Sequence, residues 1–552
     1  MGSLGQKYSS LEETRRILDF LCDQFDPIAL PPAVKDLRSQ ITFTSTRDAP
    51  YFPIPFKETE TSAALKAVEG AVACLLADLV EGEPRSRQVT VDLEKTTAFL
   101  CQAYMAKVGG QDTDLLHAQS NPYRRMSANL YETKVPGEYY HIHGSLEASI
   151  TLQMIGLEPF RPDLKAHDDI VNAIEPAVKK HSTQELEALN ATNRQAGVPA
   201  LKHEDFLKTE HGKTNIALPP WSVENLESET PKCPLTPAGQ QPTKILSGIK
   251  VLEMCRIIAG PIITRILGEY GADVLKITSP HLSDVPFFQV DGNMGKHAAE
   301  LDLKSPEERA AFEKLLAEAD VVVDGYRPGA LERLGYGATA LTRIAKERGK
   351  GFVYVNENCF GYEGEWAGRP GWQQIADCVS GVAWEQGRFM GLSEPVVPPF
   401  PISDYGTGCI GAIAALVGLY HRATRGGSWH GKASLLHYDL LLFKVGQYPD
   451  EVKQKLREDI GPDFLALRHA HSVDQISGTA LLRMRKKFPD LFDSTKYVEK
   501  WYSTAYQAEV EAVPPVVLID GVELGFKRAS RPNGTDKATW DFGDEPDRRL
   551  SS

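Results

Sequence analysis

Two spacings of hydrophobic residues alternate along the second half of the chain. Short runs rich in valine and isoleucine predict four strands, at 249–253, 273–277, 321–324 and 352–355. Apolar residues at helical spacing predict helices among them, at 260–270 and 305–318. Because such alternation is typical of a parallel sheet with helices on both faces, we predict a doubly wound α/β fold for this half.

The first half shows a different mixture of patterns. Helical periodicity predicts helices at 9–25, 62–79, 147–156, 165–180 and 183–196. Alternating residues predict a strand at 88–92 and an antiparallel hairpin within 121–145 that turns at Pro136-Gly137. His141 and His143 project to one face of this hairpin, a spacing that could ligate a metal, but no third ligand is evident and we expect no metal site. This half therefore adds a smaller α+β domain.

Composition divides the chain into segments. Residues 221–245 are dominated by Ser, Glu, Thr, Pro and Gln, which indicates a linker between a first half at 1–220 and a domain at 246–445. Residues 446–530 then form a C-terminal extension. The polar residues 531–552 are expected to be a flexible tail.

Charge and length narrow the class of protein. A chain of 552 residues is long enough for about two to four domains, and its formal net charge of -13 argues against a general nucleic-acid binder. The 8 cysteines form no CxxC pair, so neither a zinc site nor a disulfide framework is indicated. No segment is expected to be long enough to span a membrane, and the N-terminus lacks an apolar signal core. We therefore expect a soluble cytoplasmic protein that has no membrane partner.

The stretch 398–411 carries the strongest candidate for chemistry. Three prolines precede Asp404, and Gly406, Gly408 and Gly411 follow it at the start of an apolar segment with helical spacing. Asp404 therefore stands where a helix N-cap is expected, and capping alone would explain a carboxylate there. The glycines favour a second interpretation, in which a ligand approaches the backbone closely and free N–H groups stabilise negative charge.

The same glycines match the pattern GxGxxG of dinucleotide-binding folds. That fingerprint requires a hydrophobic strand immediately before it and an acidic residue about 20 residues after it. Here a proline-rich segment precedes the glycines, and His421, Arg422 and Arg425 follow them. We therefore reject a dinucleotide site.

Four motifs of the second half occur together in a known family. They are LSGIKVLEMCRIIAGP at 246–261, GADVLK at 271–276, LDLK at 301–304 and ADVVVDGYRPGALERLG at 319–335. Their order and intervals closely resemble those of the class III coenzyme A transferases, the family of formyl-CoA and carnitine-CoA transferases, over residues 246–445. The resemblance implies a Rossmann-like CoA-binding domain, an interlocked dimer, and a coenzyme A thioester as co-substrate without any permanently bound cofactor.

The resemblance also implies roles for individual residues. The nucleophile of the family is an aspartate at the position that Asp404 holds, and Gly406 and Gly408 would offer backbone amides beside it. The CoA contacts of the family correspond here to Arg256, Ala259, Leu301, Lys304, Tyr326 and Arg333. Cations and exposed amides suit a pyrophosphate and a 3′-phosphate, although Lys304 and Arg333 could also be solvated helix charges.

The implied reaction transfers CoA from an acyl-CoA donor to a carboxylic acid acceptor through an aspartyl-CoA thioester on Asp404. Two alternatives remain open. A racemase of the same fold needs two acid/base groups, and the family's racemases carry a His-Asp pair where this chain has Trp372-Gln373, of which Gln373 cannot titrate. A non-catalytic CoA-binding remnant is the other alternative, because the first half lacks the opening Rossmann-like part.

An internal repeat connects the two halves. The order helix, charged turn, strand, helix occurs at 62–104 and again at 405–445. Residues 62–220 resemble the later part of a family subunit, so we predict a fused, partly degenerate duplication that forms a homodimer or an internal pseudo-dimer. The first-half acids nearest to the Asp404 position are Glu58 and Glu60, and we expect them to be solvated charges rather than nucleophiles.

Overall fold

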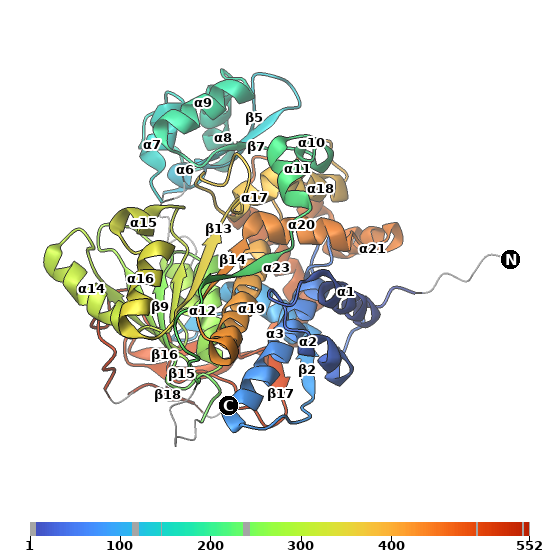
Figure 1. The fold of residues 1–552 in the computed structure, drawn as a ribbon. Helices are drawn as coiled ribbons and strands as arrows, with labels where there is room; N and C mark the ends of the chain where they lie inside the picture. The colour runs from blue at the N-terminus through green and yellow to red at the C-terminus, as the bar shows by residue number, and fades with distance from the viewer. Residues whose placement is uncertain are drawn as a thin grey trace.

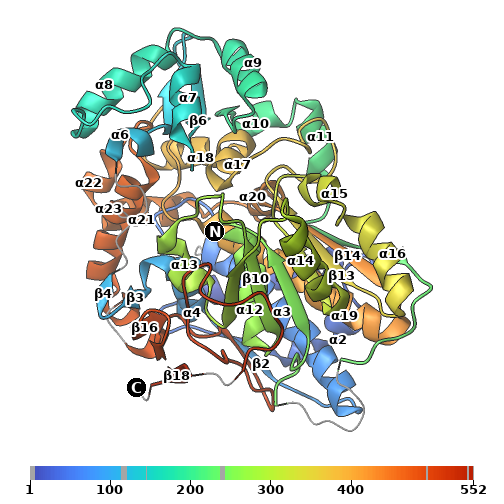
Figure 2. The same cartoon turned by 90° about the vertical axis from the view of Figure 1, so that its left-hand side faces the viewer.

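The computed structural model describes most of the chain, namely residues 7–112, 121–144, 146–235, 243–492, 495–543 and 546–550. A large sheet with helices on both faces occupies the centre, and a smaller domain lies at one end of the molecule (Figures 1 and 2).

The large sheet has seven strands in the order β11-β10-β9-β12-β13-β14-β8. Their bounds are β9 Lys250–Met254, β10 Asp273–Thr278, β11 Lys296–Glu300, β12 Val321–Asp324, β13 Val353–Asn358, β14 Ser428–Ser434 and β8 Trp221–Glu227. All neighbours pair in parallel except β8, which is antiparallel to β14. From β9 to β14 the chain follows the spatial order 3-2-1-4-5-6 of a doubly wound sheet, which confirms the predicted fold class.

Alternate side chains of each strand reach opposite faces of this sheet. Val251 belongs to the core on one face, and its neighbour Leu252 belongs to the core on the other. The covering helices are α12 (Ala259–Glu269) and α19 (Ile402–Arg425) on the first face, and α14 (Pro306–Glu318) and α16 (Ala338–Arg348) on the second. The sheet is therefore buried on both sides, as the continuous apolar runs of its strands require.

Two helices of equal length pack together in the centre of the molecule. α3 (Glu58–Glu81) and α19 each have 24 residues. Along the chain α3 follows β1 (Ile41–Thr44) and precedes β2 (Val89–Asp92) and α4 (Leu93–Leu100). α19 follows β13, with α17 (Gln373–Ser380) and α18 (Val382–Phe389) in between, and precedes β14 and α20 (Leu435–Val445). The two halves therefore share the order strand, long helix, strand, helix, with two additional helices in the second half.

Each half supplies an edge strand to the other half. β8, from the end of the first half, pairs antiparallel with β14, and β17 (Val517–Ile519), from the C-terminal extension, pairs antiparallel with β2. The prediction of a linker is therefore wrong for the residues of β8. Trp221 is 1% exposed and its indole Nε1 donates to the carbonyl of Ala29, so the strand is fixed between the halves. Residues 236–242 of the predicted linker lie outside the described part of the chain.

The smaller domain contains the predicted hairpin. β5 (Ala128–Glu132) and β6 (Tyr139–His143) pair antiparallel and are joined by β7 (Val198–Pro199). The three predicted helices are present as α7 (Ala148–Met154), α8 (His167–Val178) and α9 (Thr183–Asn193), and they share an apolar core with the hairpin. In Figures 1 and 2 this domain lies above α17 (Gln373–Ser380) and α18 (Val382–Phe389) of the second half.

The remaining elements surround these parts. The helices are α1 (Ser10–Gln24), α2 (Ala33–Asp36), α6 (Pro122–Arg125), α10 (His203–Phe206), α11 (Glu210–Ile216), α13 (Pro286–Gly292), α15 (Ala330–Leu334), α21 (Asp450–Ile460), α22 (Pro462–Leu465), α23 (Val473–Lys487) and α24 (Pro489–Phe492). The strands β18 (Arg548–Arg549), β15 (Glu499–Ser503), β16 (Ala508–Ala512), β3 (Lys107–Val108) and β4 (Gln111–Asp112) form a further sheet in that order.

Parts of the segment expected to be a flexible tail pack against the domain. Arg531 is 5% exposed, and its Nη2 donates to Asp547 Oδ2 at 2.7 Å. The indole Nε1 of Trp540 donates to the carbonyl of Leu315 at 3.0 Å. The prediction is wrong because these side chains bond to one another and to the domain, a property that polar composition does not reveal.

One helix of the described chain reaches the length and apolar character of a membrane span, although we expected none. It is Ile402–Arg425, whose mean hydropathy over the tested window is 1.4. Within the protein 94% of that window is buried. Its apolar surface therefore packs inside the core between the sheet and α3.

Candidate active site

Asp404 lies at the carboxyl end of the large sheet. The strand order reverses between β9 and β12, and doubly wound sheets bind ligands in the crevice at such a point. The loop after β9 leads into α12, whose first residue, Ala259, has its backbone N–H near enough to the Asp404 carboxylate to lower its pKa. The start of α12 therefore faces the carboxylate and favours its negative charge.

Asp404 is not the N-cap that we predicted. α19 begins at Ile402 after Pro401, so that Asp404 is the third residue of the helix. Two residues beside the site have positive φ, Phe400 at 64° and Ile257 at 67°. Bulky or β-branched residues adopt this conformation only at a cost of about 1–3 kcal/mol, and such strain is concentrated at functional sites.

The predicted role of Gly406 and Gly408 is also wrong. A Cβ at Gly406 would lie 2.0 Å from the ring of Tyr438, and one at Gly408 would lie 2.4 Å from Ile262 Cγ2. These glycines therefore let α19 pack closely against α20 and α12. Their own N–H groups lie inside the helix, where backbone bonds occupy them, and the amide that reaches Asp404 comes from Ala259 instead.

A cavity of 330 Å³, which we call the large cavity, opens beside Asp404. Most of the predicted site residues line it, namely Arg256, Ala259, Tyr326, Arg333 and Asp404. Two further cations, Arg327 and Arg369, lie on its wall. The structure therefore brings several predicted phosphate contacts and the predicted nucleophile into one space.

A second cavity of 240 Å³, the outer cavity, contains the other predicted contacts. Leu301, Lys304 and Tyr326 line it among mainly apolar neighbours. Tyr326 and Ala330 line both this cavity and the large cavity, so the two spaces adjoin. An apolar slot with a lysine at its edge suits a flat ring that carries a phosphate.

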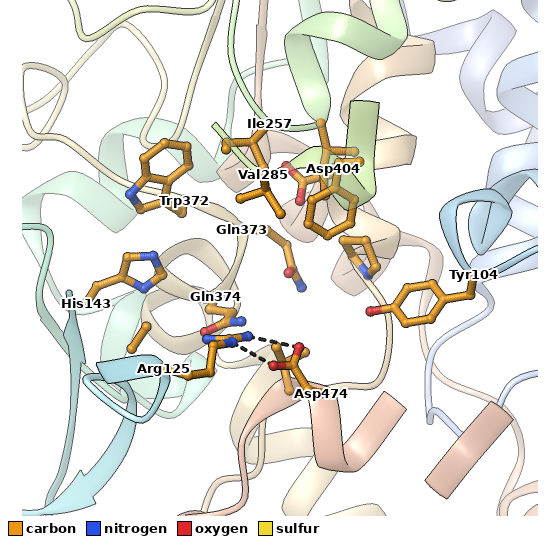
Figure 3. A pocket seen from close by; sticks show the side chains of 15 residues that line it. Tyr104, Arg125, His143, Ile257, Val285, Trp372, Gln373, Gln374, Asp404 and Asp474 are labelled. Atoms are coloured by element: carbon orange, nitrogen blue, oxygen red, sulfur yellow. Dashed lines mark hydrogen bonds and ion pairs between the residues drawn. The ribbon is translucent and has the colours of Figure 1, made fainter. Parts of the chain in front are cut away.

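A third cavity of 120 Å³, the small chamber, lies on another side of Asp404 (Figure 3). Asp404, Ile257, Ile258 and Trp372 line both the small chamber and the large cavity. Asp404 therefore stands where the two spaces meet.

Both halves of the chain build the small chamber. The first half contributes Tyr104, Arg125, Ala128 and His143, and the C-terminal extension contributes Val473 and Asp474. Figure 3 shows Arg125 and Asp474 next to each other, on the side of the chamber opposite Asp404. Nothing in the sequence pointed to this pair, because its members are 349 positions apart.

The environment of Asp404 raises its pKa. Burial of the carboxyl group is the main cause, the charge of Asp439 adds to it, and the N–H of Ala259 opposes it, so that the pKa lies at about 8. The carboxylate is thus a stronger base than an exposed aspartate.

Behind Asp404 two buried carboxyl groups share a serine. Ser403 Oγ lies 3.0 Å from Asp377 Oδ1 and 2.9 Å from Asp439 Oδ1. A hydroxyl has one proton to donate, so one of these bonds requires a protonated carboxyl group. Burial raises the pKa of Asp439 to about 7 and that of Asp377 well above its usual range, which agrees with a shared proton. Gln373 bonds to Asp377 through Nε2 and connects this pair to the small chamber.

Sequence analysis missed a second carboxyl group of the large cavity, Glu357. It follows the buried part of β13 and lines the cavity together with Asp404. Burial, with the charges of Asp404 and Asp324, raises its pKa to about 8. The signal that could have found it is its place near the carboxyl end of a parallel strand, where ligands bind in such sheets.

The histidines of the hairpin are used for packing and hydrogen bonding. His141 Nε2 lies 2.9 Å from Gln374 Oε1, and burial lowers its pKa to about 4. His143 lines the small chamber. Within the described ranges no group of three or more His, Cys, Asp or Glu side chains is arranged to hold a metal ion.

Comparisons with known proteins identify the relatives of this chain. A family model described as CoA-transferase family III matches residues 246–453. The acetyl-coenzyme A transferase nodX of Hypoxylon pulicicidum is 31% identical over 539 residues, which cover 93% of this chain and 90% of that protein. An acyl-CoA transferase of Gibberella moniliformis is 30% identical, and the match covers 88% of each chain.

Other matches cover less of the chain. The succinyl-CoA–L-malate CoA-transferase beta subunit of Chloroflexus aurantiacus is 32% identical over 42% of this chain and 60% of its own. Among solved structures, a CAIB/BAIF family protein from Brucella suis is 20% identical with a TM-score of 0.38, over 53% of this chain and 97% of that one.

Proposed function

The chain belongs to CoA-transferase family III and is a CoA-transferase, and from this premise we propose that Asp404 carries the transferred CoA as an aspartyl-CoA thioester. One observation supports this most strongly. Asp404 lines both the large cavity and the small chamber, so its carboxylate is within reach of a thioester whose CoA and acyl parts occupy the two spaces.

The proposed reaction is balanced without any redox step. A carboxylate oxygen of Asp404 attacks the carbonyl carbon of the donor thioester, and the C–S bond breaks to give a mixed anhydride and CoA thiolate. The thiolate then attacks the Asp404 carbonyl carbon, which forms the aspartyl-CoA thioester and releases the donor acid. The acceptor carboxylate attacks that thioester, and the same two steps in reverse give the new acyl-CoA and free Asp404.

The surroundings of Asp404 suit this role. A carboxylate whose pKa is raised to about 8 is more basic than usual and therefore more nucleophilic. The N–H of Ala259 at the start of α12 is placed to stabilise negative charge on the oxygens of Asp404 as bonds form and break.

The coenzyme is proposed to lie across the large and outer cavities. Arg256, Arg327 and Arg333 would meet phosphate groups in the large cavity, where cations gather. Leu301 and Lys304 would hold the adenosine end in the outer cavity, with Tyr326 at the junction. CoA would thus act as a co-substrate.

The whole molecule is proposed to be an internal pseudo-dimer that arose by duplication. Support comes from the equal lengths of α3 and α19, the matching elements around them and the exchange of β8 and β17 between the halves. In this proposal the first half contributes to the site, because its residues Arg125 and His143 form part of the wall of the small chamber.

The nucleophile is tested by Asp404→Asn. Incubation with acetyl-CoA followed by mass measurement of the intact chain should show a covalent adduct in the wild type and none in the variant. The rate of thioester exchange should fall by more than about 100-fold, because an amide does not replace a carboxylate nucleophile. Asp490→Asn is the matched control, because Asp490 is an exposed acid far along the chain. This variant should keep both the covalent adduct and the rate of thioester exchange.

Three results would contradict the proposal. Exchange in Asp404→Asn at more than about a tenth of the wild-type rate would place the nucleophile elsewhere. Deuterium exchange at the carbon next to the thioester, without CoA transfer, would favour a racemase-type reaction, and the absence of any reaction would favour a CoA-binding remnant.

A further inference from the structure

We infer that the small chamber selects short acyl groups that carry no second charge, so that the enzyme uses monocarboxylic acids and rejects dicarboxylic ones. This inference rests on the proposed function, since it assigns the small chamber to the acyl part of the substrate. The chamber meets the large cavity at Asp404, so an acyl group can lie in the chamber while the CoA part lies in the large cavity.

The size of the chamber suits a short acyl group. Its volume is 120 Å³, whereas a cavity of about 150 Å³ holds a benzene molecule. An acyl chain of roughly six heavy atoms or fewer fits such a space. Ile257, Val285, Phe288 and Val473 form apolar parts of the wall, which suit a short hydrocarbon chain.

The charges of the chamber argue against a second carboxylate. Arg125 is its cation, but both oxygens of Asp474 already accept hydrogen bonds from one side of the guanidinium, from Nε at 2.6 Å and Nη2 at 3.1 Å. Their side chains are 17% and 25% exposed, so the pair is partly buried. A distal carboxylate would have to displace Asp474 or lie beside its negative charge.

The other polar groups of the chamber do not supply a compensating charge. Burial, together with the nearby His141 and Arg125, holds the pKa of His143 well below its usual range, so this imidazole is neutral. The hydroxyl of Tyr104 has a raised pKa and is also neutral. Arg125 and Asp474 therefore cancel, and the chamber offers no net positive charge to a second carboxylate of the acyl group.

The test compares two acceptor acids, propionate and succinate, with acetyl-CoA as the donor. The wild type should transfer CoA to propionate with a kcat/KM at least about tenfold above that for succinate. In Asp474→Asn the guanidinium loses its anionic partner while the side chain keeps its size. The KM for succinate should then fall at least about tenfold, and that for propionate should change less than about threefold.

A double variant separates the two possible causes of that gain. Arg125→Gln with Asp474→Asn removes the repulsion but also the cation, so succinate should not gain. Asp490→Asn serves as the control for a remote loss of charge and should leave the ratio of the two acids unchanged.

The outcomes distinguish the inference from the function on which it rests. Succinate used as well as propionate by the wild type, or an unchanged ratio in a folded Asp474→Asn that still transfers to propionate, would overturn the inference. If Asp474→Asn does not fold, the wild-type ratio decides alone. A wild type that forms no covalent adduct on Asp404 would instead overturn the proposed function.

Discussion

Asp404 and Glu60 are the third residues of two 24-residue helices that pack together, α19 and α3. Their surroundings differ completely. Asp404 lines two cavities, whereas Glu60 is 0% exposed and accepts hydrogen bonds from the hydroxyls of Tyr8 at 2.9 Å, Ser10 at 2.8 Å and Tyr448 at 2.8 Å. The two positions therefore share a place in their helices but not access to a ligand.

We predict one covalent adduct per chain, because the acidic residues of the first half are buried away from any ligand. The expectation that Glu58 and Glu60 are solvated charges was wrong, since Glu58 is also buried and accepts from the hydroxyl of Tyr438 at 2.8 Å. Their side chains are held by hydroxyl donors and line none of the cavities beside Asp404. Intact-mass measurement after incubation with acetyl-CoA should give at most one added group.

Glu60→Gln provides the check on that prediction. Since the glutamine keeps the size and the hydrogen-bonding shape of the side chain, the adduct on Asp404 should persist at the same occupancy. A second adduct in the wild type that maps to Glu58 or Glu60 would show that the first half has a working nucleophile.

A second prediction concerns pH. Because the reaction needs the carboxylate form of Asp404 and burial raises its pKa to about 8, the fraction of reactive enzyme grows as pH rises toward that value. The kcat/KM for the acyl-CoA donor should rise about tenfold per pH unit between pH 6 and 7 and level off above about pH 8.5. Stopped-flow measurement over this range checks it, and a flat profile would show that Asp404 is fully ionised at neutral pH.

The sequence revealed much of this sheet but less of the site. Strand–helix alternation over 249–355 was sufficient for the fold, because buried parallel strands have continuous apolar runs. Motif resemblance placed Arg256, Ala259, Tyr326 and Arg333 together, and they line one cavity. Local patterns failed where long-range packing decides the structure.

Three cases show this limit. Gly406 looked like part of a ligand loop but makes room for the ring of Tyr438, which lies on another helix. Glu60 looked exposed because the residues that cover it come from α1 and from the segment after α20. The pair of Arg125 and Asp474 joins segments that only the folded chain brings together.

The third prediction tests the cations of the coenzyme site. Loss of one charge-assisted phosphate contact should weaken binding of free CoA by about 1.5–3 kcal/mol. Calorimetric titration of Lys304→Ala and Arg333→Ala should show this loss, which is about a tenfold or larger increase in Kd. Lys314→Ala, on the exposed side of α14, is the control and should bind CoA normally. Unchanged affinity in both site variants would exclude the proposed placement.

The last prediction concerns Glu357 and its effect on Asp404. The two carboxyl groups line the same cavity, and the charge of Asp404 contributes to the raised pKa of Glu357. Electrostatic repulsion between two groups is mutual, so a charge on Glu357 must in turn oppose ionisation of Asp404.

Glu357→Gln removes that charge and keeps the size of the side chain. The midpoint of the pH profile should therefore move to lower pH, with the plateau rate retained if Glu357 acts through Asp404 alone. Glu363→Gln makes the same chemical change at an exposed position six residues along and should leave the midpoint in place. A midpoint that does not move in Glu357→Gln would show that the two carboxyl groups titrate independently, and a lost plateau would show that Glu357 itself takes part in the transfer.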